Sequence, residues 1–129
     1  MNRFLKRAWA EIDLDALEHN YNEIKKLAKG KDILAVVKAN AYGHDDKAVC
    51  LKLQELGVKY YGVSNLWEGE KLRQHGITGT ILTFGYTDED YFDELLEYGI
   101  TQTAGSVQYA KQLSDCLLYT SDAADDSLR

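Results

Sequence analysis

Four glycines in this chain separate a helix-like stretch from a strand-like stretch, at Gly30, Gly57, Gly76 and Gly99. Each follows a segment with apolar residues at helical spacing and precedes a short run of apolar residues. The strand-like runs begin again after roughly 20 to 27 residues. A strand and a helix that alternate at this interval predict βα units, whose strands pair in parallel. The pattern therefore restricts the chain to the α/β class, as part of a (β/α) barrel or a doubly wound sheet.

Strands and helices alternate along the whole predicted order. Asp15 with Glu18 has the spacing of a helix-capping pair, and Asn65 with Glu68 has the same spacing. The predicted strands are Ala8–Leu14, Ile33–Val37, Tyr60–Val63, Thr80–Phe84 and Ile100–Ala104. The predicted helices are Asp15–Ala28, Asp45–Leu56, Asn65–His75, Thr87–Tyr98 and Ser106–Ser114.

The first inner strand indicates a parallel sheet, and the loops favour a barrel over a doubly wound sheet. Ile33–Val37 is apolar at every position, which is typical of a parallel strand buried on both faces. No glycine-rich phosphate loop follows any strand, so a nucleotide-binding doubly wound sheet is less favoured. A complete barrel needs about 250 residues. The sequence therefore predicts the N-terminal half of a (β/α)8 barrel over residues 1–115. Such a half has open strand edges, and we expect it to be poorly stable alone.

Composition and charge exclude several classes of protein. Lys and Arg number 15 against 21 Asp and Glu, a net charge of −6, so we expect no nucleic-acid partner. No run is long enough for a membrane span and no signal-peptide core follows Met1, which predicts a cytoplasmic protein without a membrane partner. Cys50 and Cys116 form no CxxC motif, and HExxH is absent, so we predict no metal site.

The last residues differ in character from the rest. From Cys116 the sequence is CLLYTSDAADDSLR, and the helical pattern that precedes it stops there. Cys116–Asp125 resembles the in-frame translation of a transposon-end adapter used to prepare sequencing libraries. We interpret residues 116–129 as a non-native tail, with a natural polar C-terminus as the alternative, and exclude them from the fold prediction.

One lysine stands where a barrel would carry chemistry. Side chains alternate along a strand, so Leu34, Val36 and Lys38 would share one face. If that face lines the barrel, Lys38 lies at the C-terminal mouth, where barrel enzymes place their active sites. A lysine there suits Schiff-base chemistry. The alternative is an ammonium group that reaches solvent, with Tyr42 as a packed loop aromatic and His44 as a solvated residue.

The string Ala35-Val-Val-Lys-Ala-Asn-Ala-Tyr-Gly-His44 resembles the pyridoxal-phosphate signature of the alanine racemases. The resemblance extends through about residue 114. It includes AWAEIDLDA at 8–16, GVSN at 62–65, EKLRQHGI at 70–77 and ILTFGY at 81–86. It implies an N-terminal (β/α)8 barrel, a C-terminal β domain and a homodimer.

The resemblance also implies roles for individual residues. Lys38 would hold pyridoxal 5'-phosphate through a Schiff base and act as one of two catalytic acid/bases. Tyr42 would donate its hydroxyl to the cofactor phosphate, and Val36 would pack near the cofactor. Phe84 is a further candidate, although its residue type is not diagnostic. Asp45 departs from the family, which usually has glycine there, and is read as a helix cap.

The activity implied by the resemblance is interconversion of L-alanine and D-alanine for cell-wall precursors. Proton removal and return on opposite faces would use Lys38 and a tyrosine from the partner subunit's C-terminal domain, so we expect the fragment to be inactive alone. Two alternatives remain open: a serine or broad-specificity amino-acid racemase, and a non-catalytic pyridoxal-phosphate-binding barrel. The membrane-bound serine racemases carry transmembrane helices before this module, so the short polar leader favours the alanine enzyme.

Overall fold

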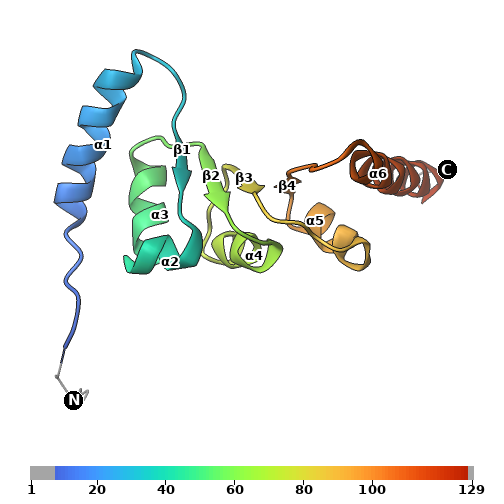
Figure 1. Cartoon of the computed structure of the whole chain (residues 1–129), viewed down its shortest axis with the longest axis horizontal. Helices are drawn as coiled ribbons and strands as arrows, with labels where there is room; N and C mark the ends of the chain where they lie inside the picture. The colour runs from blue at the N-terminus through green and yellow to red at the C-terminus, as the bar shows by residue number, and fades with distance from the viewer. Residues whose placement is uncertain (1–7, 128–129) are drawn as a thin grey trace.

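The computed structural model describes the backbone of residues 8–127 and the side chains of residues 8–118. Its strands form one parallel sheet in the order β1-β2-β3-β4 (Figure 1). Neighbours in sequence are neighbours in the sheet, without the reversal of strand order that marks a doubly wound fold. The α/β prediction is confirmed. The strands are β1 (Leu34–Val36), β2 (Tyr60–Val63), β3 (Thr80–Thr83) and β4 (Ile100–Gln102), and the helices are α1 (Leu14–Ala28), α2 (Lys38–Gly43), α3 (Asp46–Glu55), α4 (Leu66–Gln74), η1 (Glu89–Tyr91), α5 (Phe92–Glu97) and α6 (Val107–Ser127).

The two faces of the sheet differ in burial. One cross-strand row joins Ala35, Tyr61, Ile81 and Ile100, and the last three of these are buried against the helices. The adjacent row joins Val36, Gly62, Leu82 and Thr101 on the other face, where Val36 is 39% exposed. The prediction that the first strand is buried on both faces is therefore wrong for this structure. Leu34 and Val36, at the β1 edge of this second face, are each 39% exposed, so this part of the face is open to solvent.

The N-terminal segment is not the predicted strand. Residues 8–13 are exposed and form no ladder with any described strand, and α1 begins at Leu14. A strand needs a partner for its backbone groups, and alternation of apolar residues alone does not supply one. The helix cap also lies earlier than predicted. Asp13, rather than Asp15 with Glu18, accepts hydrogen bonds from the backbone N–H groups of Asp15 and Ala16 at 2.9 and 3.0 Å.

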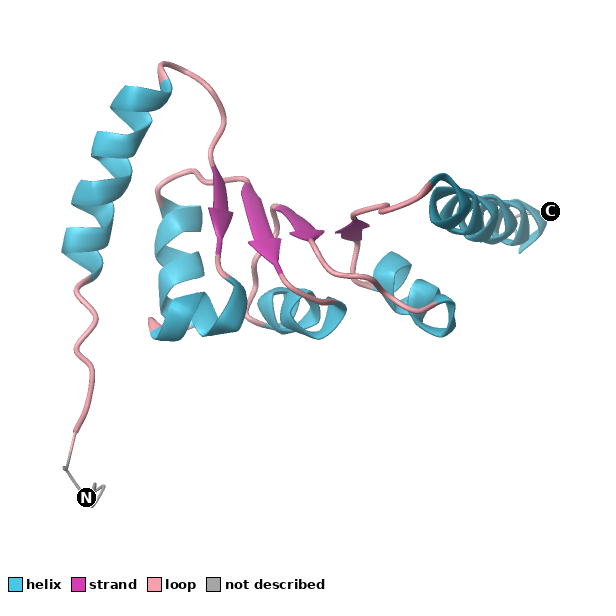
Figure 2. Cartoon of the chain, viewed as in Figure 1, coloured by secondary structure: helices cyan, strands magenta, loops and turns pink. Residues whose placement is uncertain are grey.

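Helix α1 is attached to the rest of the fold along part of its length. Leu17 and Tyr21 pack against the core, and Glu18 forms an ion pair with Lys52 of α3 at 2.6 Å. Ile24, which belongs to the predicted apolar stripe, is 53% exposed. Figure 2 shows α1 and α6 at opposite ends of the molecule, with the four strands between them.

The last two predicted helices have different bounds in the structure. The segment predicted as Thr87–Tyr98 is divided into η1 and α5, because Asp88 caps a short turn at Asp90 before the α-helix begins. Helix α6 continues to Ser127, past the predicted end at Ser114. Leu113 and Cys116 pack against the core, which stabilises the continued helix. Within residues 8–127 no helix combines the length and apolarity that a bilayer crossing requires.

A single arginine joins the loops at the N-terminal ends of β3 and β4. The Arg73 guanidinium donates hydrogen bonds to the carbonyl oxygens of Ile77 and Gly79 before β3, at 2.8 and 2.7 Å. It also donates to those of Tyr98 and Gly99 before β4, at 2.8 and 2.9 Å. Its planar fork of donors satisfies carbonyl groups of two loops at once, which a lysine cannot reproduce.

We expect Arg73→Lys to lower the free energy of unfolding by about 2–3 kcal/mol, because two or more charge-assisted hydrogen bonds are lost. Urea unfolding followed by circular dichroism measures this. Gln74→Ala, an exposed change at the end of the same helix, is the control and should cost less than about 0.5 kcal/mol. Equal unfolding energies for the two variants would show that Arg73 does not join the loops.

Candidate active site

The segment after β1 has a rare backbone conformation. Val37 has a ψ angle of 19°, so the chain leaves the extended form before Lys38. Ala39, Asn40, Ala41 and Tyr42 then follow with φ angles of 52–56° and ψ angles of 36–49°, and Gly43 has a φ of 84°. This is a left-handed turn. For residues with a Cβ it costs about 1–2 kcal/mol each, so surrounding contacts must hold it.

This geometry changes one step of the sequence argument. Strand alternation placed Lys38 on the face of Val36, but the regular strand ends at Val36 and Lys38 opens α2. Alternation alone therefore does not determine the direction of the lysine. Its half-buried side chain has an Nζ atom that forms no hydrogen bond or ion pair with any residue the structure describes. The amine is thus left without an intramolecular partner in that part of the chain.

Hydrogen bonds within the turn hold part of it. The N–H of Ala41 donates to the Val37 carbonyl at 2.9 Å, and the N–H of His44 donates to the Ala41 carbonyl at 3.1 Å. The His44 ring nitrogen Nδ1 lies 3.0 Å from the Ala41 carbonyl oxygen and 3.2 Å from that of Tyr42. His44 therefore closes the C-terminal end of the turn, rather than being simply a solvated residue.

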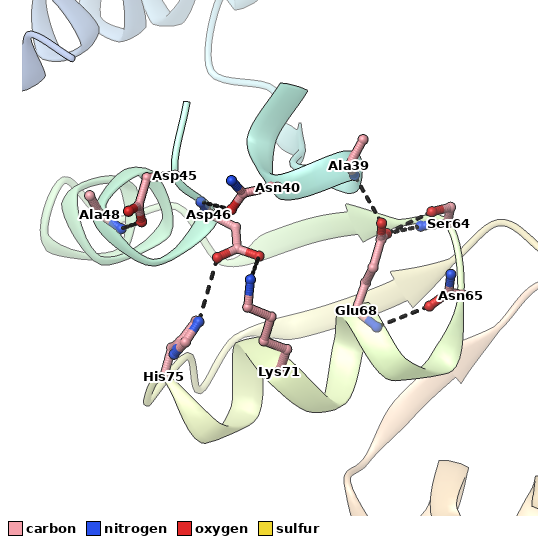
Figure 3. Close-up of polar contacts among 10 residues, drawn as sticks. All are labelled: Ala39, Asn40, Asp45, Asp46, Ala48, Ser64, Asn65, Glu68, Lys71 and His75. Atoms are coloured by element: carbon pink, nitrogen blue, oxygen red, sulfur yellow. Dashed lines mark hydrogen bonds and ion pairs between the residues drawn. The ribbon is translucent and has the colours of Figure 1, made fainter. Parts of the chain in front are cut away.

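Helix α3 fixes the turn from one side. The N–H of Asp46 donates to the Asn40 side-chain oxygen at 3.0 Å, and Asp45 caps the helix by accepting from the Ala48 N–H at 3.0 Å (Figure 3). The interpretation of Asp45 as a cap is confirmed. Asn40 is well suited to its place, because asparagine tolerates the left-handed region better than most residues.

The Asp46 side chain links α3 to α4. It is 5% exposed and accepts a hydrogen bond from Lys71 Nζ at 2.8 Å, which raises the pKa of Lys71. His75 Nε2 lies 3.5 Å from the other carboxylate oxygen (Figure 3). Burial, and secondly the charge of Asp46, raises the pKa of the Cys50 thiol to about 12. Cys50 is therefore a protonated core residue at neutral pH and not a nucleophile.

Helix α4 fixes the turn from the other side through Glu68. One carboxylate oxygen accepts from the Ala39 N–H at 2.9 Å, and the other accepts from the Ser64 N–H and hydroxyl, both at 2.7 Å. The Glu68 N–H donates to the Asn65 side chain at 3.0 Å, which confirms the predicted cap at Asn65 (Figure 3). The Glu68 side chain, however, reaches past Asn65 to the residue after Lys38.

The predicted site residues do not all line one cavity. Val36 and Tyr42 line a groove of about 630 Å³ between the N-terminal segment and β1, and Lys38 is not among the residues that line it. Tyr42 is 59% exposed, and its hydroxyl forms no hydrogen bond with any residue that the structure describes. Phe84 lies over Gly62, where a Cβ would come within 2.6 Å of the Phe84 ring. Phe84 thus covers the open face of the sheet next to β1.

Sequence reasoning missed two residues of this site. Glu68 was recognised only as a capping partner, because its spacing from Asn65 fully explained it. Asn40 stood inside the motif without a role of its own. No local signal predicts a left-handed turn that contains two alanines and a tyrosine, since each of these residues disfavours that conformation.

Comparison with known proteins places the chain in a family. Residues 12–124 match the family model described as alanine racemase, N-terminal domain. The chain belongs to this family. The alanine racemase of Clostridium perfringens strain SM101 is 42% identical over 118 residues, which are 92% of this chain and 31% of that protein. The chain therefore spans about a third of the length of such alanine racemase relatives.

Solved structures agree with this family. The structure of an alanine racemase from Clostridium difficile 630 matches with a TM-score of 0.82 and 38% identity, over 88% of this chain and 30% of that one. The histidine racemase from Leuconostoc mesenteroides subsp. sake matches with a TM-score of 0.77 and 29% identity, over 84% of this chain and 29% of that one. The α/β architecture of this chain is thus that of the alanine racemase barrel, of which it forms the N-terminal part.

We expect Asn40→Ala to lower the free energy of unfolding by about 2 kcal/mol, because alanine tolerates the left-handed region less well than asparagine and the bond to Asp46 is lost. Asn40→Gly is the matched control, since it loses the same bond but relieves the backbone strain. It should cost about 1 kcal/mol less than alanine. Thermal and urea unfolding measure both variants, and equal costs would show that the turn is not strained at Asn40.

Proposed function

We propose that Lys38 holds pyridoxal 5'-phosphate covalently at Nζ, as the cofactor lysine of an amino-acid racemase. The observation that carries the proposal is the setting of this amine in a member of the alanine racemase family. Lys38 follows the C-terminal end of β1 and precedes a strained turn held by two helices. Its Nζ has no hydrogen-bond or ion-pair partner in the described structure. An unpaired amine at a rigid position suits covalent carbonyl chemistry.

The other predicted residues fit a phosphorylated aromatic cofactor. The exposed residue Tyr42 lies in the same turn, and its hydroxyl would donate a hydrogen bond to the phosphate. Val36 offers an exposed apolar surface on β1, against which a ring can pack and exclude water. These residues form only part of a site. The remaining contacts would come from the parts of the relatives' length that this chain does not span.

The bound cofactor would supply an electron sink that stabilises negative charge at the α carbon of an amino acid. The Lys38 amine would remove or return the α proton on one face of that carbon. The turn would restrict the movement of Lys38, because Glu68 and Asp46 hold the two residues that follow it, Ala39 and Asn40, through hydrogen bonds. Tyr42 would restrain the phosphate end and so limit rotation of the ring.

We propose L-alanine and D-alanine as the substrates of the whole protein. We also propose that the whole protein acts as a homodimer in the cytoplasm. The alanine racemase relatives support this choice. A racemase of another amino acid is the second candidate, because a histidine racemase shares this part of the fold. Assays of the full-length gene product with L-alanine, L-serine and L-histidine would decide, and turnover of alanine below that of the other two would overturn the first choice.

We also propose that residues 116–129 are not native. The support is their resemblance to a translated adapter, although the family match extends to residue 124. Sequencing the source DNA across the codon for Cys116 tests this. An open frame that continues through the rest of a barrel would support the proposal, and a genomic sequence identical to the tail would overturn it.

We expect Lys38→Ala to abolish the preferential covalent incorporation of pyridoxal phosphate at position 38 and to leave only the background label on exposed lysines. The protein is incubated with the cofactor, reduced with borohydride and digested, and the labelled lysine is located by mass spectrometry. Lys47→Ala, at an exposed position on α3, is the control and should leave the label on Lys38. Specific labelling of a different lysine in the unmodified chain would overturn the assignment.

We expect Tyr42→Phe to weaken retention of the cofactor by about 1–2 kcal/mol, or about tenfold in affinity, because a hydrogen bond to a charged phosphate is lost. The measurement is a titration of cofactor absorbance. Tyr60→Phe, on the neighbouring strand β2, is the control for the loss of a tyrosine hydroxyl outside the turn. Unchanged affinity in Tyr42→Phe would show that Tyr42 serves only in packing.

A further inference from the structure

Glu68 occupies a position that capping alone does not explain. A glutamate three residues after the cap normally turns back to the N–H of the capping residue. Here the carboxylate passes Asn65 and binds Ser64, the residue directly after β2. Its second oxygen points away from α4 and accepts a hydrogen bond from the Ala39 N–H at 2.9 Å. Glu68 therefore connects the carboxyl end of β2 to the peptide group that follows Lys38.

That peptide group has few alternatives for its hydrogen bond. Ala39 begins the left-handed run with φ 52° and ψ 49°, so its N–H belongs to neither the β1 ladder nor a right-handed helix. The nitrogen of Ala39 is joined to the carbonyl carbon of Lys38. Fixing the N–H therefore fixes the plane of the peptide bond through which the Lys38 backbone leaves the strand.

The carboxylate form of Glu68 is the one that suits this arrangement. It accepts three hydrogen bonds from N–H and O–H donors, which use both of its oxygens. Burial raises the pKa of Glu68. The hydrogen bonds from Ser64 and Ala39 together lower it by more, so the pKa lies below its ordinary value. The ionised form is thus stabilised by the fold. The contribution of Glu68 to stability is present above its unfolded pKa and is lost as pH falls through the lower folded value.

We propose that Glu68 is a positioning residue for Lys38. By holding the Ala39 peptide at the end of β2, Glu68 orients the lysine for the cofactor. This rests on the proposed function of Lys38. Glu68 would not touch the reacting atoms. It acts through the backbone, and Ser64 keeps its carboxylate turned so that one oxygen faces Ala39.

The test compares Glu68→Gln with Glu70→Gln in the 129-residue chain. Glutamine has nearly the shape of glutamate but only one acceptor oxygen, so it cannot serve Ala39 and Ser64 together. Glu70 lies on the same helix, and its carboxylate accepts from the Gln74 side chain at 3.0 Å, away from the turn. Each protein is exposed to pyridoxal phosphate and reduced with borohydride, and the label on Lys38 is quantified relative to exposed Lys111.

We expect Glu68→Gln to lower the Lys38-to-Lys111 ratio about tenfold, the loss expected for one charge-assisted hydrogen bond. Glu70→Gln should stay within about twofold of the unmodified chain. Circular dichroism spectra of both variants are compared with that of the unmodified chain, to check that the variants are folded. If Glu68→Gln does not fold, Glu68→Asp is used, which keeps the charge but is one methylene too short to reach both partners, and the same loss is expected.

Three results would overturn the inference. If Lys38 is enriched equally in Glu68→Gln and the unmodified chain, Glu68 does not position the lysine, and the proposed function stands. If Glu70→Gln loses as much as Glu68→Gln, the effect belongs to α4 as a whole. If the unmodified chain shows no enrichment at Lys38, the proposed function fails and this inference fails with it.

Discussion

The run of left-handed residues after β1 is the constraint that organises the surrounding structure. Four consecutive residues with a Cβ adopt positive φ angles there. Each is disfavoured by contact between Cβ and the backbone, so the turn exists only because its neighbours over-determine it. Helix α3 contributes the N–H of Asp46, and α4 contributes the Glu68 carboxylate. The positions of both helices are therefore linked to the backbone that carries Lys38.

The two ends of the sheet serve different purposes. At the N-terminal ends of β3 and β4, Arg73 satisfies four carbonyl groups and contributes to stability. At the C-terminal ends, the half-buried Glu68 carboxylate and the backbone N–H of Asp46 hold the turn, while Tyr42 and Val36 remain exposed. This division is general in βα architectures, because the loops at the C-terminal ends are free to vary while the opposite loops complete the packing.

Local patterns predicted most of the fold. The bounds of β2 and the capped start of α4 agree with the structure, since a short apolar run and the Asn65 cap depend on neighbouring residues only. The predicted strand at Ala8–Leu14 was wrong because alternation describes a side chain pattern and not a pairing partner. Helix α6 continues past Ser114, and Cys116 packs against a core assembled from distant segments, a contact that a one-dimensional pattern does not contain.

The sequence by itself determined the class of fold and the identity of the candidate site. Glycines that separate helices from strands limit the chain to βα units, and the string around Lys38 indicates the family without reference to geometry. Only the tertiary structure decided how that string is held. The bond from Ala39 to Glu68 joins residues 29 positions apart, and the left-handed turn costs energy that no local preference returns. Such a conformation is stabilised by contacts made across the fold, so it becomes visible only when the helices are in place.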